Sequence, residues 1–473
     1  MEKGNQKEVS FRTALFPVAT LIFLLIFGLL VVPKVFQMAP LPIELLFILA
    51  ATAAMIQLKF LGHSWDGIQD AVVAKISKAM PTLLILLSIG IIIGSWIVCG
   101  TIPMLVNFGI QMIHPDYIYL ISFLVPVVFS TVTGTSWGSV GTIGVVLIGV
   151  AISLQAHLPI VAAAIIGGAY FGDKLSPLSD TTNVAALATE IKVYEHIKSM
   201  MFTTIPSALI AAIVFFLAAW WYPVTSTNTE TELIQITLGQ TAQAFNFSPF
   251  LLIPPLIVLI GSLKKYPTLP VMMISAFSAV LLAFLFQDYS IDVVLRSMFY
   301  GFNTESMGFE VHESVANLYN RGGMYAFKEP VLVSLLVFIF VGAIEKIDAM
   351  KIIVKRLFGF VKTKGALVRS VLLSTGITNA MTSNQYATSF IVGDAFKHKF
   401  DDLGLKRNVL SRSLEDTGTM IESLVPWHQS AIYMSATLGV AVADYWFWQV
   451  FSLANILIAF VFATFGVALF RKS

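Results

Sequence analysis

Apolar runs of membrane-spanning length recur along the whole chain. A helix needs ~20 mostly apolar residues to cross the hydrocarbon core of a bilayer. The runs lie at about residues 13–33, 43–61, 80–98, 117–132, 158–172, 203–222, 248–263, 268–286, 329–344, 366–381, 404–414 and 446–470. This pattern predicts an all-α polytopic membrane protein with about twelve transmembrane segments.

Composition supports this prediction. Apolar residues make up 57% of the 473 residues and charged residues only 12%, whereas soluble domains carry about 25% charged residues. The net charge is +2 and the basic residues are scattered over short connections, so nothing indicates a nucleic-acid partner. A single cysteine, Cys99, rules out an intrachain disulfide and a multi-cysteine metal site.

The distribution of charge predicts an orientation. The stretch 223–247 contains Glu230 and Glu232 but no Lys or Arg, while Lys264–Lys265 and Arg471–Lys472 lie in other connections. Cytoplasmic loops are the ones enriched in Lys and Arg. We therefore expect a multi-pass protein of the cell membrane with both termini in the cytoplasm and an acidic linker outside.

The same linker separates two related halves. We predict an N-terminal half, 1–222, whose first repeat covers about 64–222, and a C-terminal half, 248–473, whose second repeat covers about 312–470. The matched segments are Met80–Pro81 with Glu329–Pro330, Thr135–Ser136 with Thr382–Ser383, and Pro177–Asn183 with Ser413–Thr419. Repeats of opposite orientation are typical of ion-coupled transporters, so we expect two inverted-topology repeats with broken helices.

The first predicted break is Thr131–Thr142, whose counterpart in the second half is Thr378–Thr388. Three glycines, Gly134, Gly138 and Gly141, loosen the backbone there, and hydroxyl groups could replace the hydration shell of an ion. Broken helices in a bilayer are tolerated where they line a cavity or pack against protein. Close packing of helices through the small residues is the alternative explanation.

The second predicted break is Gly172–Asn183, in which Pro177 interrupts the helix. Asp173 and Asp180 lie seven residues apart, close to two turns, and would share a face if the segment stayed helical. A buried carboxylate can bind a proton or a cation but not both at once, which gives exchange. The alternative is an ordinary Asp–Lys pair, Asp173 with Lys174, at the membrane edge.

These motifs define a predicted site near the middle of the bilayer. The expected ion- and proton-binding residues are Asp173, Asp180, Asn183, Glu415, Asp416 and Thr417. The residues expected to complete the coordination are Thr135, Ser136, Thr382, Ser383 and Asn384. Sodium itself is assigned to Asp180, Asp416, Asn183, Ser136 and Asn384. Glu345, within an apolar run, and His428, a possible proton relay, are weaker candidates.

Two enzyme motifs fail on context. Gly134–Gly138 matches the Gly-x-Ser-x-Gly nucleophile elbow, but that motif needs a strand before its serine, Ser136. His312–Glu313 resembles a zinc-protease motif, but Ala316 stands where the second histidine belongs. We therefore expect no enzyme activity and no cofactor.

The motif Gly134–Thr142 and the longer Gly167–Asn183 resemble the NhaC family of sodium/proton antiporters. The resemblance implies exchange of cytoplasmic Na⁺ for external H⁺, and its alternative is a sodium- and proton-coupled exchanger of small carboxylates such as malate against lactate. We prefer sodium/proton exchange because no arginine lies at the centre of an apolar run. A passive channel is the rival from another class. Expected partners are Na⁺, H⁺ and the lipid bilayer, and a homodimer is one compatible assembly.

Overall fold

The computed structural model describes residues 9–224, 228–358 and 361–470. Within these ranges the chain is almost entirely helical and contains no strand, which confirms the all-α prediction. Nine helices of the described chain are long and apolar enough to span a membrane, or up to eleven if each of two bent pairs is one span. Glu230 and the pair Arg471–Lys472, used above for orientation, lie outside the part whose side chains are described.

The count of spans differs from the twelve apolar runs in two places. Ser136–Ser153 is a span of its own, although its start was predicted only as a break. The run 404–414 falls on a short helix, α21 (Arg407–Ser413), which continues directly as the π-helix η7 (Leu414–Thr419). Charged and hydroxyl residues in this segment make it too polar for a simple hydropathy criterion.

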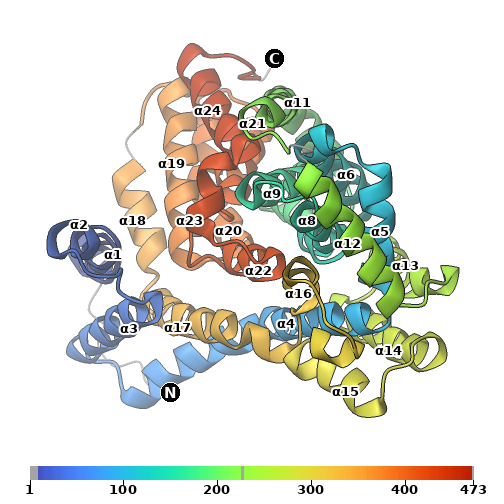
Figure 1. Ribbon diagram of the computed structural model, residues 1–473. Helices are drawn as coiled ribbons and strands as arrows, with labels where there is room; N and C mark the ends of the chain where they lie inside the picture. Colours follow the sequence, from blue (N-terminus) through green and yellow to red (C-terminus); the bar gives the residue numbers. More distant parts are fainter. Residues whose placement is uncertain (1–8, 225–227, 359–360, 471–473) are drawn as a thin grey trace.

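One group of helices, which we call the scaffold, packs around the long helix α4 (Trp65–Val98). Ser64 caps α4 by accepting a hydrogen bond from the backbone N–H of Gly67. The other members are α3 (Ile43–Phe60), α13 (Ile253–Leu263), α14 (Thr268–Phe286), α15 (Ile291–Tyr300) and α17 (Lys328–Glu345). Figure 1 shows α4 and α17 running together along one side of the molecule.

The second group, the bundle, lies against the scaffold in Figure 1. Its members from the first half are α6 (Ile118–Thr133), α7 (Ser136–Ser139), α8 (Val145–Ser153), α9 (Leu158–Leu175), α10 (Asp180–Ala188) and α11 (Val193–Trp221). Those from the second half are α19 (Lys364–Thr382), α20 (Gln385–Asp402), α21, η7, α22 (Gln429–Leu438) and α24 (Val450–Phe465).

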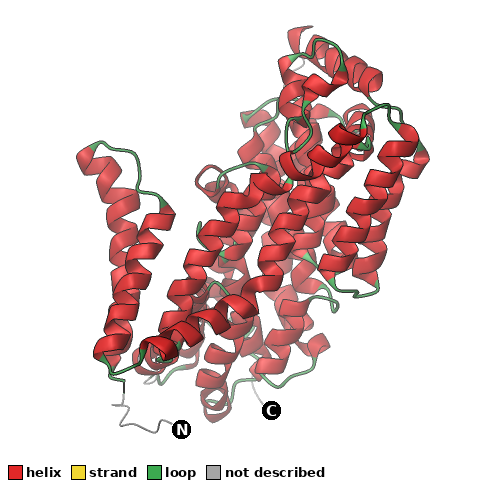
Figure 2. Ribbon diagram, turned by 90° about the horizontal axis from the view of Figure 1, so that it is seen from below, coloured by secondary structure: helices red, strands yellow, loops and turns green. Residues whose placement is uncertain are grey.

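Glycines allow the bundle helices to approach closely. A Cβ atom on Gly168 would lie 2.2 Å from the carbonyl oxygen of Phe123, and one on Gly172 would lie 2.2 Å from the backbone nitrogen of Thr131. Helices α6 and α9 therefore touch backbone to backbone, as small residues permit in membranes. Figure 2 shows the helices running lengthwise, with both described ends of the chain at the same end of the bundle.

The first predicted break occurs in both halves with the same geometry. Helix α6 ends at Gly134 (φ +72°) and α19 at Ser383 (φ +50°), both left-handed. The next residue, Thr135 or Asn384, caps the following helix by accepting a hydrogen bond from the backbone N–H three positions on. Thr135 thus corresponds to Asn384, at a spacing of 249 residues, which moves the predicted match by two positions.

The second predicted match is wrong. Pro177 does lie in a break, between α9 and α10, and Ser179 caps α10. Ser413–Thr419, its supposed counterpart, is continuous helix and π-helix. The equivalent break lies 249 residues after the first, around Pro426, where His428 caps α22. The opposite orientation of the two repeats stays a prediction.

Candidate functional site

A cavity of about 370 Å³ lies between the scaffold and the bundle. Its scaffold wall is mainly apolar, with Ile85, Ile89 and Ile92 of α4 and Val271 and Met272 of α14. Its bundle wall is polar because all four helix breaks reach it. The polar residues from these breaks are Thr133, Thr135, Ser136, Asp173, Asp180, Thr181, Ser383, Asn384, Gln385, Glu422, His428, Gln429 and Ser430.

Asp173, near the end of α9, is the best-defined carboxylate of this wall. Its side chain is 7% exposed. One carboxylate oxygen, Oδ2, accepts hydrogen bonds from the hydroxyl of Ser136 at 2.6 Å and from the backbone N–H of Ser136 at 3.3 Å. Ser136 begins α7, and the positive end of a helix dipole favours a negative charge. The break therefore stabilises an ionised carboxylate that faces the cavity.

Asp180 also lines the cavity but in a different setting. It is the first residue of α10 and is exposed. The four-residue break between α9 and α10 separates it from Asp173, so the two do not share one helix face as predicted. Their charges still repel across the break. Asp180 is placed to meet a cation as it enters the cavity.

The cavity also contains a polar network whose centre, Glu422, the sequence-based site omitted. Glu422 is 6% exposed, and its Oε2 accepts hydrogen bonds from the hydroxyls of Ser430 (2.7 Å) and Tyr170 (3.3 Å). His428 lies 3.3 Å from Asn379 Oδ1 through Nε2, and its Nδ1 accepts the backbone N–H of Ser430. The matching prolines Pro177 and Pro426, 249 residues apart, could have revealed Glu422 as the counterpart of Asp173.

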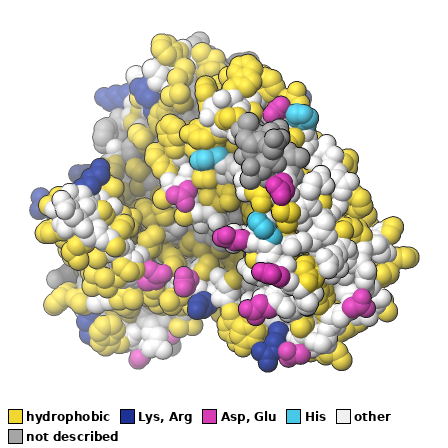
Figure 3. Space-filling model, in the orientation of Figure 1, with side chains coloured by type: hydrophobic (Ala, Val, Ile, Leu, Met, Phe, Trp, Pro, Cys, Tyr) yellow, Lys and Arg dark blue, Asp and Glu magenta, His cyan; other side chains and the backbone are white. Residues whose placement is uncertain are grey.

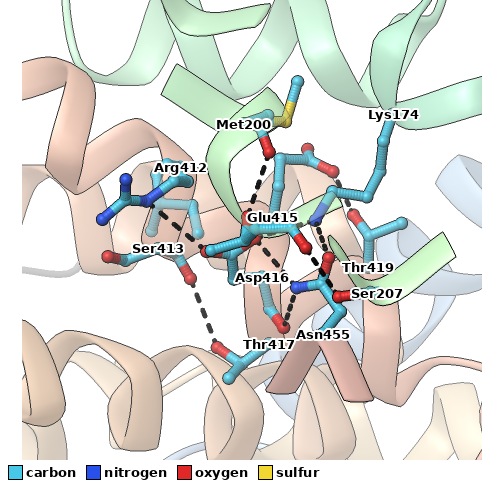
Figure 4. Close-up of polar contacts among 12 residues, drawn as sticks. Lys174, Met200, Ser207, Arg412, Ser413, Glu415, Asp416, Thr417, Thr419 and Asn455 are labelled. Atoms are coloured by element: carbon cyan, nitrogen blue, oxygen red, sulfur yellow. Dashed lines mark hydrogen bonds and ion pairs between the residues drawn. The ribbon is translucent and has the colours of Figure 1, made fainter. Parts of the chain in front are cut away.

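Asp416 lies elsewhere, in a buried ion-pair cluster (Figure 4). Lys174 Nζ lies 2.9 Å from Asp416 Oδ1, and the Arg412 Nε lies 3.6 Å from Oδ2. Asn455 and Thr203 also donate to Oδ1, at 2.9 and 2.8 Å. The charged side chains are at most 2% exposed, and none lines the cavity. Asp416 therefore already has its cations within the protein.

Four other predicted residues also make internal contacts outside the cavity lining. Thr417 donates to the carbonyl of Leu372 at 2.8 Å, and Asn183 to the carbonyl of Ser179 at 2.6 Å. Glu415 accepts from Thr419, and Thr382 pairs with Thr388 at 3.1 Å. Of the five residues assigned to sodium, the cavity thus gathers Asp180, Ser136 and Asn384. Glu345 pairs with Lys75 at 2.6 Å within the scaffold.

Comparison with known proteins identifies the family. Residues 168–467 match the Na⁺/H⁺ antiporter family, a stretch that includes the second break of the first half and the whole second half of the bundle. The chain belongs to this family. The predicted resemblance to the NhaC family is confirmed by a relative at 34% identity, the Na⁺/H⁺ antiporter NhaC of Bacillus subtilis, with 89% of this chain and 92% of the relative covered.

Two further relatives show the range of names carried by similar chains. One from Haemophilus influenzae, 38% identical over 91% of this chain and 92% of its own length, is named as an uncharacterized Na⁺/H⁺ antiporter. Another from Bacillus subtilis, 32% identical over 90% of each chain, is a malate-2H⁺/Na⁺-lactate antiporter. The antiporter described here is thus a multi-pass membrane protein that exchanges sodium for protons, and its relatives are named as transporters.

Proposed function

We propose that Asp173 is the carboxylate at which sodium and protons compete. The observation that carries this proposal is its position: buried, facing the cavity, and bound by both donors of Ser136. Lys265, which is exposed, is the one Lys or Arg side chain among the described residues that line the cavity. A carboxylate without a protein cation must be neutralised by a proton or by a metal ion.

The two walls of the cavity support a cycle of alternating access. Oxygen ligands on the bundle wall can replace water around Na⁺, whereas the apolar scaffold wall offers none. Sodium from the cytoplasm would displace the proton of Asp173, and the bundle would then move against the scaffold to open the cavity outward. A proton from outside would release the sodium and allow the return.

Exchange of organic acids is the second candidate function. The cavity is larger than one ion requires, because a water molecule occupies only ~30 Å³, and one relative is named for malate and lactate. Against it, three carboxylates and a single exposed lysine line the cavity. Protein oxygens also occupy helix N-termini that could bind an anion: Asp173 at α7 and Ser383 at α22. We therefore favour simple sodium/proton exchange.

Transport in proteoliposomes tests this choice. With a pH-sensitive dye inside, sodium alone should drive protons against their gradient, and Asp173→Asn should abolish the signal. Asp292→Asn, on the exposed surface of α15, should transport normally. Proton movement that requires malate or lactate would favour the organic-acid exchanger, and unchanged exchange by Asp173→Asn would remove this residue from the site. A channel would let protons run down their own gradient only.

We also propose a location in the cell membrane with both termini cytoplasmic. Figure 3 shows Asp and Glu side chains around the middle of one face, with Lys and Arg nearer its margin, as expected for an external surface. Cysteine labelling of intact cells should reach this face and not the chain ends. The homodimer stays a prediction, tested by the mass of the solubilised protein.

A further inference from the structure

We infer that Glu422 is a second proton-carrying carboxylate of the exchange site, the counterpart in the second half of Asp173 in the first. This inference rests on the proposed role of Asp173. The two residues occupy the same place in equivalent breaks, because each lies six positions before the residue that caps the next helix, Ser179 or His428. Both side chains are buried and both line the cavity.

The hydrogen bonds of the two carboxylates are also alike. Asp173 accepts from Ser136, at the start of α7, and Glu422 accepts from Ser430, at the start of α22. Each therefore lies close to the positive end of a helix dipole, which lowers the cost of an ionised carboxylate in the membrane interior. These contacts suit a group that loses and regains a proton, because the donors remain when the negative charge appears.

The two carboxylates belong to one site. Tyr170 bonds to Glu422 at 3.3 Å and lies three residues before Asp173 on α9, so on the same side of that helix. The charges of Asp173 and Glu422 act on each other. The other titratable groups near Glu422 are Glu415 of η7, His428, Tyr386 and Tyr445. None of these is a permanent cation.

A consequence follows for the number of protons exchanged. Two neighbouring carboxylates in a dry site cannot both be charged unless a cation lies between them. Without sodium both bind protons, whereas a sodium ion allows both to ionise. One bound sodium therefore releases two protons, and each cycle moves one net positive charge inward as sodium leaves the cell.

Counting protons on sodium binding tests the inference. Calorimetry of the purified antiporter in buffers of different ionisation enthalpy, over a pH series, gives the number released per sodium. We expect a maximum near two for the wild type and near one for Glu422→Gln, with two restored in Glu422→Asp. In proteoliposomes, an inside-negative potential should speed sodium export by the wild type and leave Glu422→Gln exchange unaffected.

The outcomes separate this inference from the proposed function. One proton per sodium in the wild type, or two in Glu422→Gln, would overturn the role of Glu422 and leave Asp173 untouched. Unchanged sodium binding by Asp173→Asn would overturn the proposed site itself. If Glu422→Gln does not bind sodium, Glu422→Asp and the voltage dependence of the wild type decide, because voltage-independent exchange by the wild type contradicts two protons per sodium.

Discussion

Asp173 and Lys174 are neighbours in the sequence but belong to two different regions of the molecule. Asp173 faces the cavity and is bound only by neutral donors of Ser136. Lys174 is fully buried on the other side and forms an ion pair with Asp416. A single turn of α9 thus carries one charge that can change partners and one that cannot.

The comparison shows what makes a buried charge available for transport. Asp416 is held by Lys174, Arg412, Asn455 and Thr203, so a sodium ion would have to displace two protein cations. Removing one partner of such a pair leaves an uncompensated charge, which is costly in a medium of low dielectric constant. Asp173 has no protein cation to displace. The cluster holds α9 against η7, and the cavity performs the exchange.

The largest change in stability should come from breaking the cluster. Asp416→Asn leaves Lys174 without its partner and should cost about 3–5 kcal/mol of unfolding free energy. Asp173→Asn should cost far less, because the cavity carboxylate already exchanges its charge for a proton. Thermal unfolding of the two purified variants checks this contrast, and equal losses of stability would contradict it.

A paired substitution sharpens the same point. Lys174→Met combined with Asp416→Leu removes both charges, and such replacements are often neutral or stabilising. The double variant should therefore be more stable than Asp416→Asn alone. If it is as unstable as the single variant, the cluster contributes through its hydrogen bonds rather than through its ion pair.

The sequence was sufficient to predict the breaks that build the site. Gly134, with its left-handed backbone, and Pro177 are residue types that interrupt helices, and both breaks formed where expected. The left-handed turn at Ser383 gave a weaker signal because serine rarely takes that conformation. Length and hydropathy likewise predicted most spans, but a polar helix such as α19 is hard to distinguish from a loop by hydropathy.

What the sequence could not give was the direction in which each carboxylate points. The letters Asp-Thr occur at Asp180–Thr181 and Asp416–Thr417, which suggested equivalent roles. The structure pairs Asp173 with Glu422 instead, because the helix breaks, not the acidic letters, are what repeat at 249 residues. Whether a buried Asp meets a cavity or a lysine depends on helices distant in sequence, such as α24 with its Asn455.

A smaller effect is expected from the neutral donor that distinguishes Asp173. Ser136→Ala removes the 2.6 Å hydroxyl bond but keeps the backbone N–H. The ionised carboxylate should lose about 1 kcal/mol of stabilisation, so apparent sodium affinity should fall roughly five-fold at fixed pH. Sodium titrations of exchange rate measure this change. Ser139→Ala, whose hydroxyl bonds only to Thr135 and Thr133, is the control, and equal losses in both variants would mean a general disturbance of α7.

The smallest effect should appear at Glu190, an acidic side chain that is paired but exposed outside the membrane spans. Lys397 and Arg407 hydrogen-bond to it and hold the pKa of Glu190 below its usual value. A depressed pKa in the folded state contributes stability above the unfolded pKa, near ~4.3, and loses it as pH falls through the folded pKa. Exposed pairs contribute little, so Glu190→Gln should lower the Tm slightly at neutral pH. This difference should vanish in acid, while Glu195→Gln, exposed on α11, should show no such trend. A constant difference at all pH values would mean that the pairing charge of Glu190 contributes nothing to stability.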